Sequence, residues 1–379
     1  MPILQKEAAS LSGVIAAIRI SPQLRDINGG ADDGYVILIS EDGTTQALEA
    51  GPMDTGQLVW GESGLFFSGP TNEFLLTDDG LTSHTRGTEE VYETARFLSP
   101  GNEGFISLYN AGFGDGHYEN HIVTGSKASA SSWETSGYFS WVSQCDDVII
   151  GVSDIAETAL SSARPPSKTE VLMQLYPKPS NEESALLSTL DFEGEYVGTS
   201  YEAPCLNGTS YSLSNYFEQP DIPDSGYPVI RSWNISSGAH SVLPLVNEDG
   251  SPLDISMDDV MVNLGIITEG TYWWASQLGQ VFSTDLESGT TNEEYQFELT
   301  SPEMGEAQFI FTEDSIFVLD VSQDKKEPLD LSRYDLMTGK RTRLMTVSSI
   351  GAIYKGDMIL RDMALNPEWV TKNEITKHE

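Results

Sequence analysis

The nine-residue stretch "RYDLMTGKR" at Arg333–Arg341 has two close relatives in the same chain: "STDLESGTT" at Ser283–Thr291 and "SWNISSGAH" at Ser232–His240. All three read Asp or Asn, Leu or Ile, any residue, Ser or Thr, Gly. Glycine supplies the positive φ that a tight turn needs, and the short polar side chain can bond the backbone of that turn. Each copy therefore predicts a hairpin. The three glycines lie 51 and 50 residues apart, a period typical of repeat architectures.

Weaker copies of the turn lie upstream, at "NHIVTGSK" (Gly125), "TDDGLT" (Gly80) and "SEDGTT" (Gly43), and a version without glycine fits near Ser180. Seven turns predict seven units. Short apolar runs separated by polar turns indicate an all-β chain. In the sixth unit four strands can be placed, at residues 307–312, 315–322, 329–336 and 340–347. Four antiparallel strands in each repeat are typical of a propeller blade.

On these residues the chain resembles the β-propeller repeat proteins, in which a D-L-x-[ST]-G turn joins the third and fourth strands of a blade. The resemblance implies one all-β domain over residues 1–379, with seven four-stranded blades. Strands from both termini would share one blade, either one strand from one terminus and three from the other or two from each. This arrangement removes exposed sheet edges. The blades are expected at about residues 51–87, 88–132, 133–190, 191–246, 247–300, 301–348, and 349–379 joined with 1–50.

The charge of the chain limits its partners. It carries 58 acidic and 20 basic residues, a formal net charge of -38. Nucleic-acid affinity comes largely from neutralising phosphates with Lys and Arg, so we expect no nucleic-acid partner. The chain lacks an apolar run of about 18 residues, so we expect no direct insertion into a membrane. Such a charge also favours a soluble monomer.

The long connections between the second and third strands predict a binding face. They are residues 21–33, 111–116, 155–169, 218–228 and 324–328. Binding residues concentrate on loops held by a rigid scaffold, and aromatic rings suit a protein, peptide or carbohydrate ligand. The blade-to-blade connections are acidic and would meet at a channel mouth; they hold Asp54, Glu89, Glu90, Glu134, Asp191, Glu193, Asp254, Asp258, Asp259, Glu303 and Glu306. The candidate ligand-binding residues are Phe113, His117, Trp133, Glu134, Tyr216, Phe217, Tyr227, Asp258 and Asp259.

Two short segments contain residue types that can bind a metal ion. "GDGHYENH" (Gly114–His121) has two histidines and a glutamate, but His121 takes the turn position held elsewhere by Asp or Asn, so we expect it to bond a hairpin instead. "DINGGADDG" (Asp26–Gly34) clusters oxygen ligands that suit calcium, although its spacing matches no EF-hand. We predict no cofactor, with calcium at Asp26, Asn28, Asp32 and Asp33 as the alternative.

The two cysteines, Cys145 and Cys205, occupy similar positions in neighbouring blades, so they are candidates for a disulfide, with two free thiols as the alternative. A disulfide would place the protein outside the cytosol. The first twenty residues contain no visible signal peptide, so an extracytoplasmic protein would have a leader upstream of Met1; the alternative is a cytoplasmic protein.

The sequence therefore predicts a noncatalytic extracytoplasmic binding or scaffolding domain that uses the long-loop face. No G-x-S-x-G, P-loop, H-E-x-x-H or C-x-x-C motif occurs, and no catalytic residue is predicted. The alternative is a glycoside hydrolase or lyase with paired carboxylates at the channel mouth, since such enzymes need only two suitably spaced acids.

Overall fold

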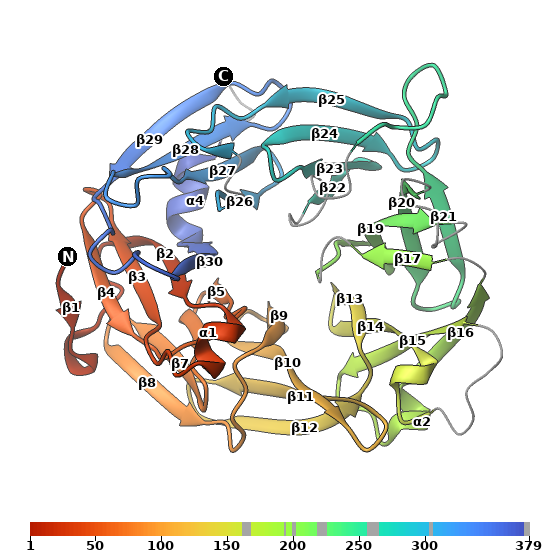
Figure 1. Cartoon of the computed structure of the whole chain (residues 1–379), viewed down its shortest axis with the longest axis horizontal. Coiled ribbons are helices and arrows are strands. Elements are labelled where there is room, and N and C mark those ends of the chain that lie inside the picture. Colours follow the sequence, from red (N-terminus) through yellow and green to blue (C-terminus); the bar gives the residue numbers. More distant parts are fainter. Residues whose placement is uncertain are drawn as a thin grey trace. The chain divides into compact units, whose positions relative to one another are not determined.

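The computed structural model describes residues 1–160, 168–192, 195–198, 202–217, 226–255, 265–302 and 306–374. The described strands form seven sheets, each with four antiparallel strands at its centre, so the fold is an all-β propeller with seven blades (Figure 1). The chain divides into two compact units. Unit 1 holds Met1–Ala111, His121–Trp133 and Leu299–Glu379, and unit 2 holds Gly112–Asn120 and Glu134–Glu298.

In unit 1, two sheets are simple antiparallel meanders. One comprises β5 (Leu58–Gly61), β6 (Gly64–Ser68), β7 (Asn72–Thr77) and β8 (Gly80–Thr85). The other comprises β26 (Gln308–Phe311), β27 (Ser315–Asp320), β28 (Leu329–Asp335) and β29 (Arg341–Val347). A third sheet comprises β9 (Glu93–Leu98), β10 (Gly104–Gly114), β11 (His117–Ser126) and β12 (Ala130–Ser136); the tip of its β10–β11 hairpin belongs to unit 2.

The remaining sheet of unit 1 joins the two ends of the chain. Its order is β1 (Ile3–Leu4), β4 (Thr45–Glu49), β3 (Tyr35–Ser40), β2 (Val14–Ser21) and β30 (Ile359–Leu365). The C-terminal β30 lies beside the N-terminal β2 (Figure 1), with Ala17 opposite Ala364. The four antiparallel strands of the shared blade are thus one C-terminal strand and three N-terminal strands, which is one of the two predicted arrangements. β1 adds a fifth strand, parallel to β4.

The apolar runs of the shared blade form the largest part of the unit 1 core. Every residue of β2 is buried, and Ile18 packs in the same cluster as Phe317 on β27 and Leu331 on β28. Trp369 of α4 (Pro367–Asn373) closes this cluster. Burial of side chains of this size contributes about 1.5–3 kcal/mol each. This packing holds the terminal strands to their neighbours.

Unit 2 contains three further sheets. They are β13 (Phe139–Cys145), β14 (Val148–Asp154), β15 (Lys168–Tyr176) and β16 (Leu186–Phe192); β17 (Glu195–Gly198), β18 (Cys205–Leu206), β19 (Thr209–Phe217), β20 (Gly226–Asn234) and β21 (His240–Pro244); and β22 (Ile266–Thr268), β23 (Thr271–Ala275), β24 (Gln280–Asp285) and β25 (Thr291–Gln296). Cys145 and Cys205 form a disulfide, as the sequence suggested. It ties the end of β13 to β18.

The repeated turn motif has the structure that its residues predict. The Oδ1 atom of Asp335 accepts the backbone N–H of Thr338 at 2.7 Å, and Asp285 accepts that of Ser288 at the same distance. Asn234 does the same with Ser237 at 3.0 Å. The three motif glycines have φ between 64° and 77°. The polar side chain and the glycine therefore form the turn together.

The weaker copy at Gly125 does not form this turn. Gly125 lies inside β11, and the turn follows at residues 126–129, where the N–H of Ser126 bonds the carbonyl of Ser129. A Cβ on Gly125 would come within 2.4 Å of the Phe105 ring, so glycine is needed there for packing. His121, which was predicted to bond a hairpin turn, lies inside β11, and its Nδ1 atom contacts Glu90.

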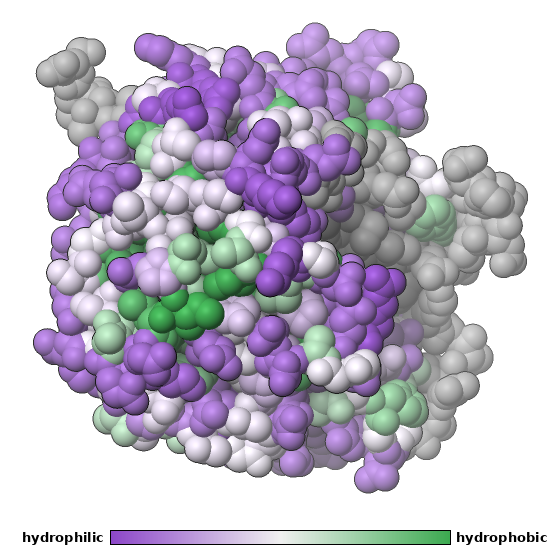
Figure 2. All heavy atoms as spheres, turned by 60° about the vertical axis from the view of Figure 1, so that its left-hand side comes forward, coloured by the Kyte–Doolittle hydropathy of each residue, from purple (hydrophilic) through white to green (hydrophobic). Residues whose placement is uncertain are grey.

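Hydrophilic residues cover most of the face shown in Figure 2, and hydrophobic residues gather in only a small part of it. Among the described residues, the exposed large hydrophobic side chains are those of Ile3, Leu24, Phe113, Tyr138 and Met337. The helices within the described ranges are all too short or too polar to cross a membrane.

Candidate functional site

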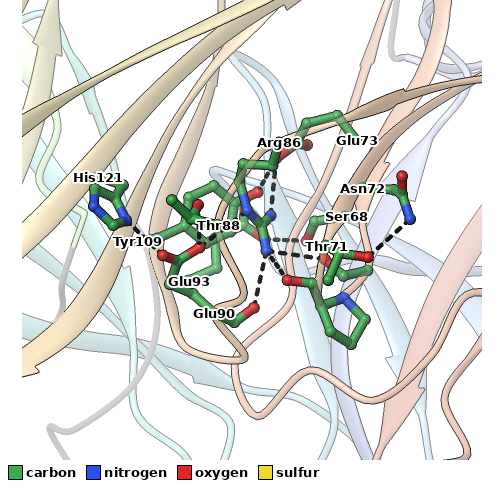
Figure 3. Close-up of polar contacts among 12 residues, drawn as sticks. Ser68, Thr71, Asn72, Glu73, Arg86, Thr88, Glu90, Glu93, Tyr109 and His121 are labelled. Carbon is green, nitrogen blue, oxygen red and sulfur yellow. Dashed lines mark hydrogen bonds and ion pairs between the residues drawn. The ribbon is translucent and has the colours of Figure 1, made fainter.

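A buried network of charged side chains lies in unit 1, where the β5–β8 and β9–β12 sheets meet (Figure 3). Glu73 on β7 is its centre. One carboxylate oxygen pairs with Arg86 at 3.0 Å and also accepts the Tyr109 hydroxyl, while the other pairs with Arg96 at 2.7 Å. Arg96 also pairs with Glu93 at 2.8 Å. The carboxylates are thus matched by two arginines.

Arg86 anchors the connection from β8 to β9. Its Nε pairs with Glu90 at 3.1 Å, and its Nη2 donates to the carbonyls of Gly69, Pro70 and Glu90. Glu90 in turn contacts His121. Glu90 was predicted among the carboxylates of an acidic channel mouth, but its side chain is buried, paired with Arg86 and in contact with His121. A buried carboxylate needs such partners because an unpaired charge is costly to desolvate.

Burial and neighbouring charges fix the protonation states of Tyr109 and Arg96 in this network. Burial is the main cause that raises the pKa of Tyr109 well above its usual value, and the nearby carboxylates of Glu73 and Glu93 raise it further. Burial alone would lower the pKa of Arg96, but Glu93, Tyr109 and Glu73 outweigh it and the pKa is raised. Tyr109 therefore stays neutral and Arg96 stays charged. Each group is committed to a neighbour, which suits a role in joining two sheets rather than contact with a ligand.

The predicted calcium residues partly converge. Asp26, Asp32 and Asp33 line one pocket of about 190 Å³ together with Asp357, whereas Asn28 ends the short helix α1 (Leu24–Asn28) and does not line it. Burial and the neighbouring Asp33 raise the pKa of Tyr35. Among the residues that the structure describes, no group of three or more His, Cys, Asp or Glu side chains has an arrangement that could hold a metal. Calcium here stays a prediction.

The tip of the β10–β11 hairpin, in unit 2, carries an aromatic cluster. Residues 111–116 were expected to be a long loop, but β10 extends to Gly114 and only Asp115 and Gly116 form the turn. Their φ values, 45° and 91°, are both positive, as a two-residue type I′ hairpin requires, and Asp-Gly is a favoured pair for it. The turn places Phe113 and Tyr118 side by side on the two strands.

At this tip the Tyr118 ring contacts the rings of both Phe113 and Tyr138. The ring centroids of Phe113 and Tyr118 lie 5.3 Å apart, edge to face, and those of Tyr118 and Tyr138 lie 5.0 Å apart. Phe113 is 63% exposed and Tyr138 is 43% exposed. We call Phe113, Tyr118 and Tyr138 the aromatic tip. Large apolar side chains that stay exposed together usually mark a contact surface.

Residues around Gly137 hold Tyr138 in place. The N–H of Gly137 bonds the carbonyl of Tyr118 at 2.9 Å, and the Asn120 side chain donates to the Gly137 carbonyl at 2.6 Å. Gly137 has a φ of 131°, and a Cβ there would lie 3.0 Å from the Ser153 hydroxyl. The aromatic tip is therefore supported by backbone bonds and does not depend on packing alone.

The other predicted ligand-binding residues are distributed as follows. Tyr216 on β19 and Tyr227 on β20 are opposite each other, with ring centroids 5.5 Å apart, so they form a pair within unit 2. Phe217 is opposite Gly226 in the same hairpin. Trp133 and Glu134 are consecutive in β12, and His117 begins β11. Asp258 and Asp259 lie outside the described residues.

Tyr118 and Tyr138 were not predicted. A signal for Tyr118 exists in the sequence, because Asp115-Gly116 is a two-residue hairpin turn and Tyr118 then faces Phe113 across it. No local signal identifies Tyr138, because the bonds of Gly137 that bring it to Tyr118 join residues distant in sequence.

Comparison with known proteins identifies relatives of the chain. The model of the YycP β-propeller domain matches residues 9–190 and 263–365. No curated protein matches.

Three solved structures are similar to the chain. BamB from Moraxella catarrhalis has 13% identity and a TM-score of 0.41 over 75% of this chain and 73% of its own. The β-propeller domain of the Trilobed protease from Pyrococcus furiosus has 9% identity and a TM-score of 0.47 over 94% and 97%. Apo AztD from Citrobacter koseri has 11% identity and a TM-score of 0.43 over 93% and 98%. These likenesses say nothing about activity or ligand.

Proposed function

We propose that this chain, which belongs to the YycP β-propeller domain family, is a noncatalytic binding domain that works outside the cytoplasm and holds its ligand at the aromatic tip. A propeller is a rigid scaffold, and its function depends on the residues that it presents. The observation that carries the proposal is the contact of Tyr118 with both Phe113 and Tyr138, two rings that stay exposed.

The aromatic tip has the properties of a recognition surface. Aromatic side chains supply large contact areas at low conformational cost, and they dominate the binding energy of many interfaces. The type I′ turn and the Gly137 bonds fix the rings before a ligand arrives. Preorganisation of this kind lowers the entropy lost on binding. A ligand would therefore gain affinity here without a large rearrangement of the hairpin.

The proposed location rests on the Cys145–Cys205 disulfide. Disulfides persist in oxidising compartments and are rare in the cytosol, where thiols are kept reduced. A test is to alkylate intact cells before lysis and to measure the mass of the protein. We expect neither cysteine to be alkylated until the protein is reduced. Two alkylated cysteines without reduction would contradict an extracytoplasmic location.

The binding proposal can be tested with arrays of short peptides and oligosaccharides, comparing wild type with Phe113→Ala/Tyr138→Ala. Both side chains are exposed, so their truncation should cost little stability. A matched control is Met337→Ala, because Met337 is a similarly exposed apolar residue (69%) in unit 1. We expect wild type and the control to retain the same array ligands and the double variant to lose them. Ligands that bind all three proteins equally, or none at all, would refute a site at the aromatic tip.

A further inference from the structure

We infer that the aromatic tip recognises a cationic peptide segment of a partner protein, rich in Lys or Arg; this inference rests on the proposed binding function. The rings alone would suit several ligand classes. The charge around them separates these classes, and it can be followed from the whole unit down to the hairpin.

Unit 2 is almost free of basic residues. It holds 28 of the chain's 58 acidic residues but only 4 of its 20 basic residues. One of the four, Arg231, is buried in an ion pair with Glu170. The excess of acid is therefore much greater in the unit that bears the aromatic tip than in unit 1, which has 30 acidic and 16 basic residues. Such a surface attracts cationic partners and repels anionic ones.

Carboxylates also lie in the hairpin itself. Asp115 occupies the exposed turn, and the Glu119 side chain lies over Gly114, where a Cβ would be 2.7 Å from its Oε1 atom. Glu182 accepts the N–H of Ser136 at 2.9 Å, two residues before Tyr138. Asp115 therefore lies in the turn between Phe113 and Tyr118, and Glu119 lies on the face of β11 opposite Tyr118. A neutral sugar would use the rings but would gain nothing from these charges.

The interior of the protein shows the same chemistry. The Arg86 guanidinium lies 3.9 Å from the centroid of the Tyr109 ring while it pairs with Glu73. In unit 2, Arg231 lies 4.7 Å from the Trp141 ring while it pairs with Glu170. A cation stacked on an aromatic face beside a carboxylate gains from both contacts. At the aromatic tip, Phe113 and Tyr138 offer exposed rings to a cation supplied from outside, and Asp115 in the adjoining turn offers an exposed carboxylate.

The test measures binding of fluorescein-labelled deca-arginine and deca-lysine by anisotropy, with a ten-residue Gly-Ser peptide and maltoheptaose as uncharged probes. Two tip variants are compared: Phe113→Ala/Tyr138→Ala, and Asp115→Asn/Glu119→Gln. Asparagine tolerates the left-handed conformation of residue 115, so the turn should be kept. The matched control is Asp146→Asn/Asp147→Asn. Asp146 is also exposed, with a φ of 53°, in the turn at the opposite end of β13 from Tyr138.

We expect wild type and the Asp146 control to bind the cationic peptides alike, and each tip variant to lose affinity about tenfold, a change of about 1.4 kcal/mol. Equal binding of the cationic peptides to all four proteins would mean general attraction to an acidic surface and would overturn the inference. Binding of maltoheptaose or the Gly-Ser peptide through the rings, without binding of the cationic peptides, would overturn the inference and leave the proposed function intact. If none of the probes nor any array ligand depends on the rings, both proposals fail.

Discussion

Removal of the Cys145–Cys205 disulfide should destabilise the protein by several kcal/mol. The two cysteines are 60 residues apart in sequence, and the bond joins two neighbouring sheets of unit 2. In the chain-entropy treatment, a crosslink lowers the entropy of the unfolded chain by about 2.1 + 1.5R ln n cal/mol/K. For a loop of about 60 residues this is about 14 cal/mol/K, or about 4 kcal/mol at 25 °C.

The assay is urea unfolding of wild type and Cys145→Ala/Cys205→Ala, followed by tryptophan fluorescence. Trp141 is a useful probe because it lies on β13 with Cys145, buried against Ser210. With an m-value of about 3 kcal/mol/M, a loss of about 4 kcal/mol lowers the urea midpoint by about 1.3 M. Reductant should lower the midpoint of wild type similarly.

The control is the double variant with reductant, whose midpoint should not change because it has no disulfide to break. If oxidised wild type and the variant unfold at the same urea concentration, the disulfide does not stabilise the protein by lowering the entropy of the unfolded chain. That result would refute the entropy argument. If the two differ but reductant leaves wild type unchanged, the lost stability comes from packing around Cys145, which is buried.

Three further predictions concern unit 1. Glu73→Gln should lower the free energy of unfolding by about 3–5 kcal/mol in thermal unfolding, because it removes the charged partner of two buried arginines. The control is Glu62→Gln, since Glu62 is exposed and its substitution should have no comparable effect. Equal effects of the two substitutions would contradict the role of the network. Burial raises the pKa of Asp362 to about 7 from 3.8, so the folded state keeps a proton that the unfolded state loses, and stability should fall by up to about 4 kcal/mol as the pH rises from 4 to 7. Asp362→Asn should remove this slope in urea unfolding measured across that pH range, and an unchanged slope would assign it to another group. About 1 mM calcium should raise the melting temperature if the aspartate pocket binds it; Asp33→Asn should abolish the shift, and the absence of any shift in wild type would rule out this calcium site.

Strand positions could be predicted well where the turn chemistry was strong. The sixth unit was predicted at 307–312, 315–322, 329–336 and 340–347, and the strands are β26 (Gln308–Phe311), β27 (Ser315–Asp320), β28 (Leu329–Asp335) and β29 (Arg341–Val347). The motif turn and the alternation of apolar residues are both local properties. Where the motif was weak, at Gly125, the same reasoning placed the turn too early.

The candidate site was predicted less completely. Phe113 was chosen as an exposed aromatic residue, and the structure adds Tyr118 and Tyr138 to it. Glu90 was expected at an acidic mouth and is buried against Arg86 instead. A count of charges gives the sign of a surface, but it cannot tell which carboxylates have found a cationic partner in the interior.

The sequence by itself determined the repeat, the hairpin turns and the overall charge, because each depends on residues within a few positions of one another or on composition alone. Only the tertiary structure decided the partners of the side chains. Glu73, Arg96 and Tyr109 come from three strands of two sheets, and Tyr138 reaches Tyr118 through a glycine carbonyl and amide. Such contacts depend on how strands distant in sequence pack together, and no local pattern of residue types records them.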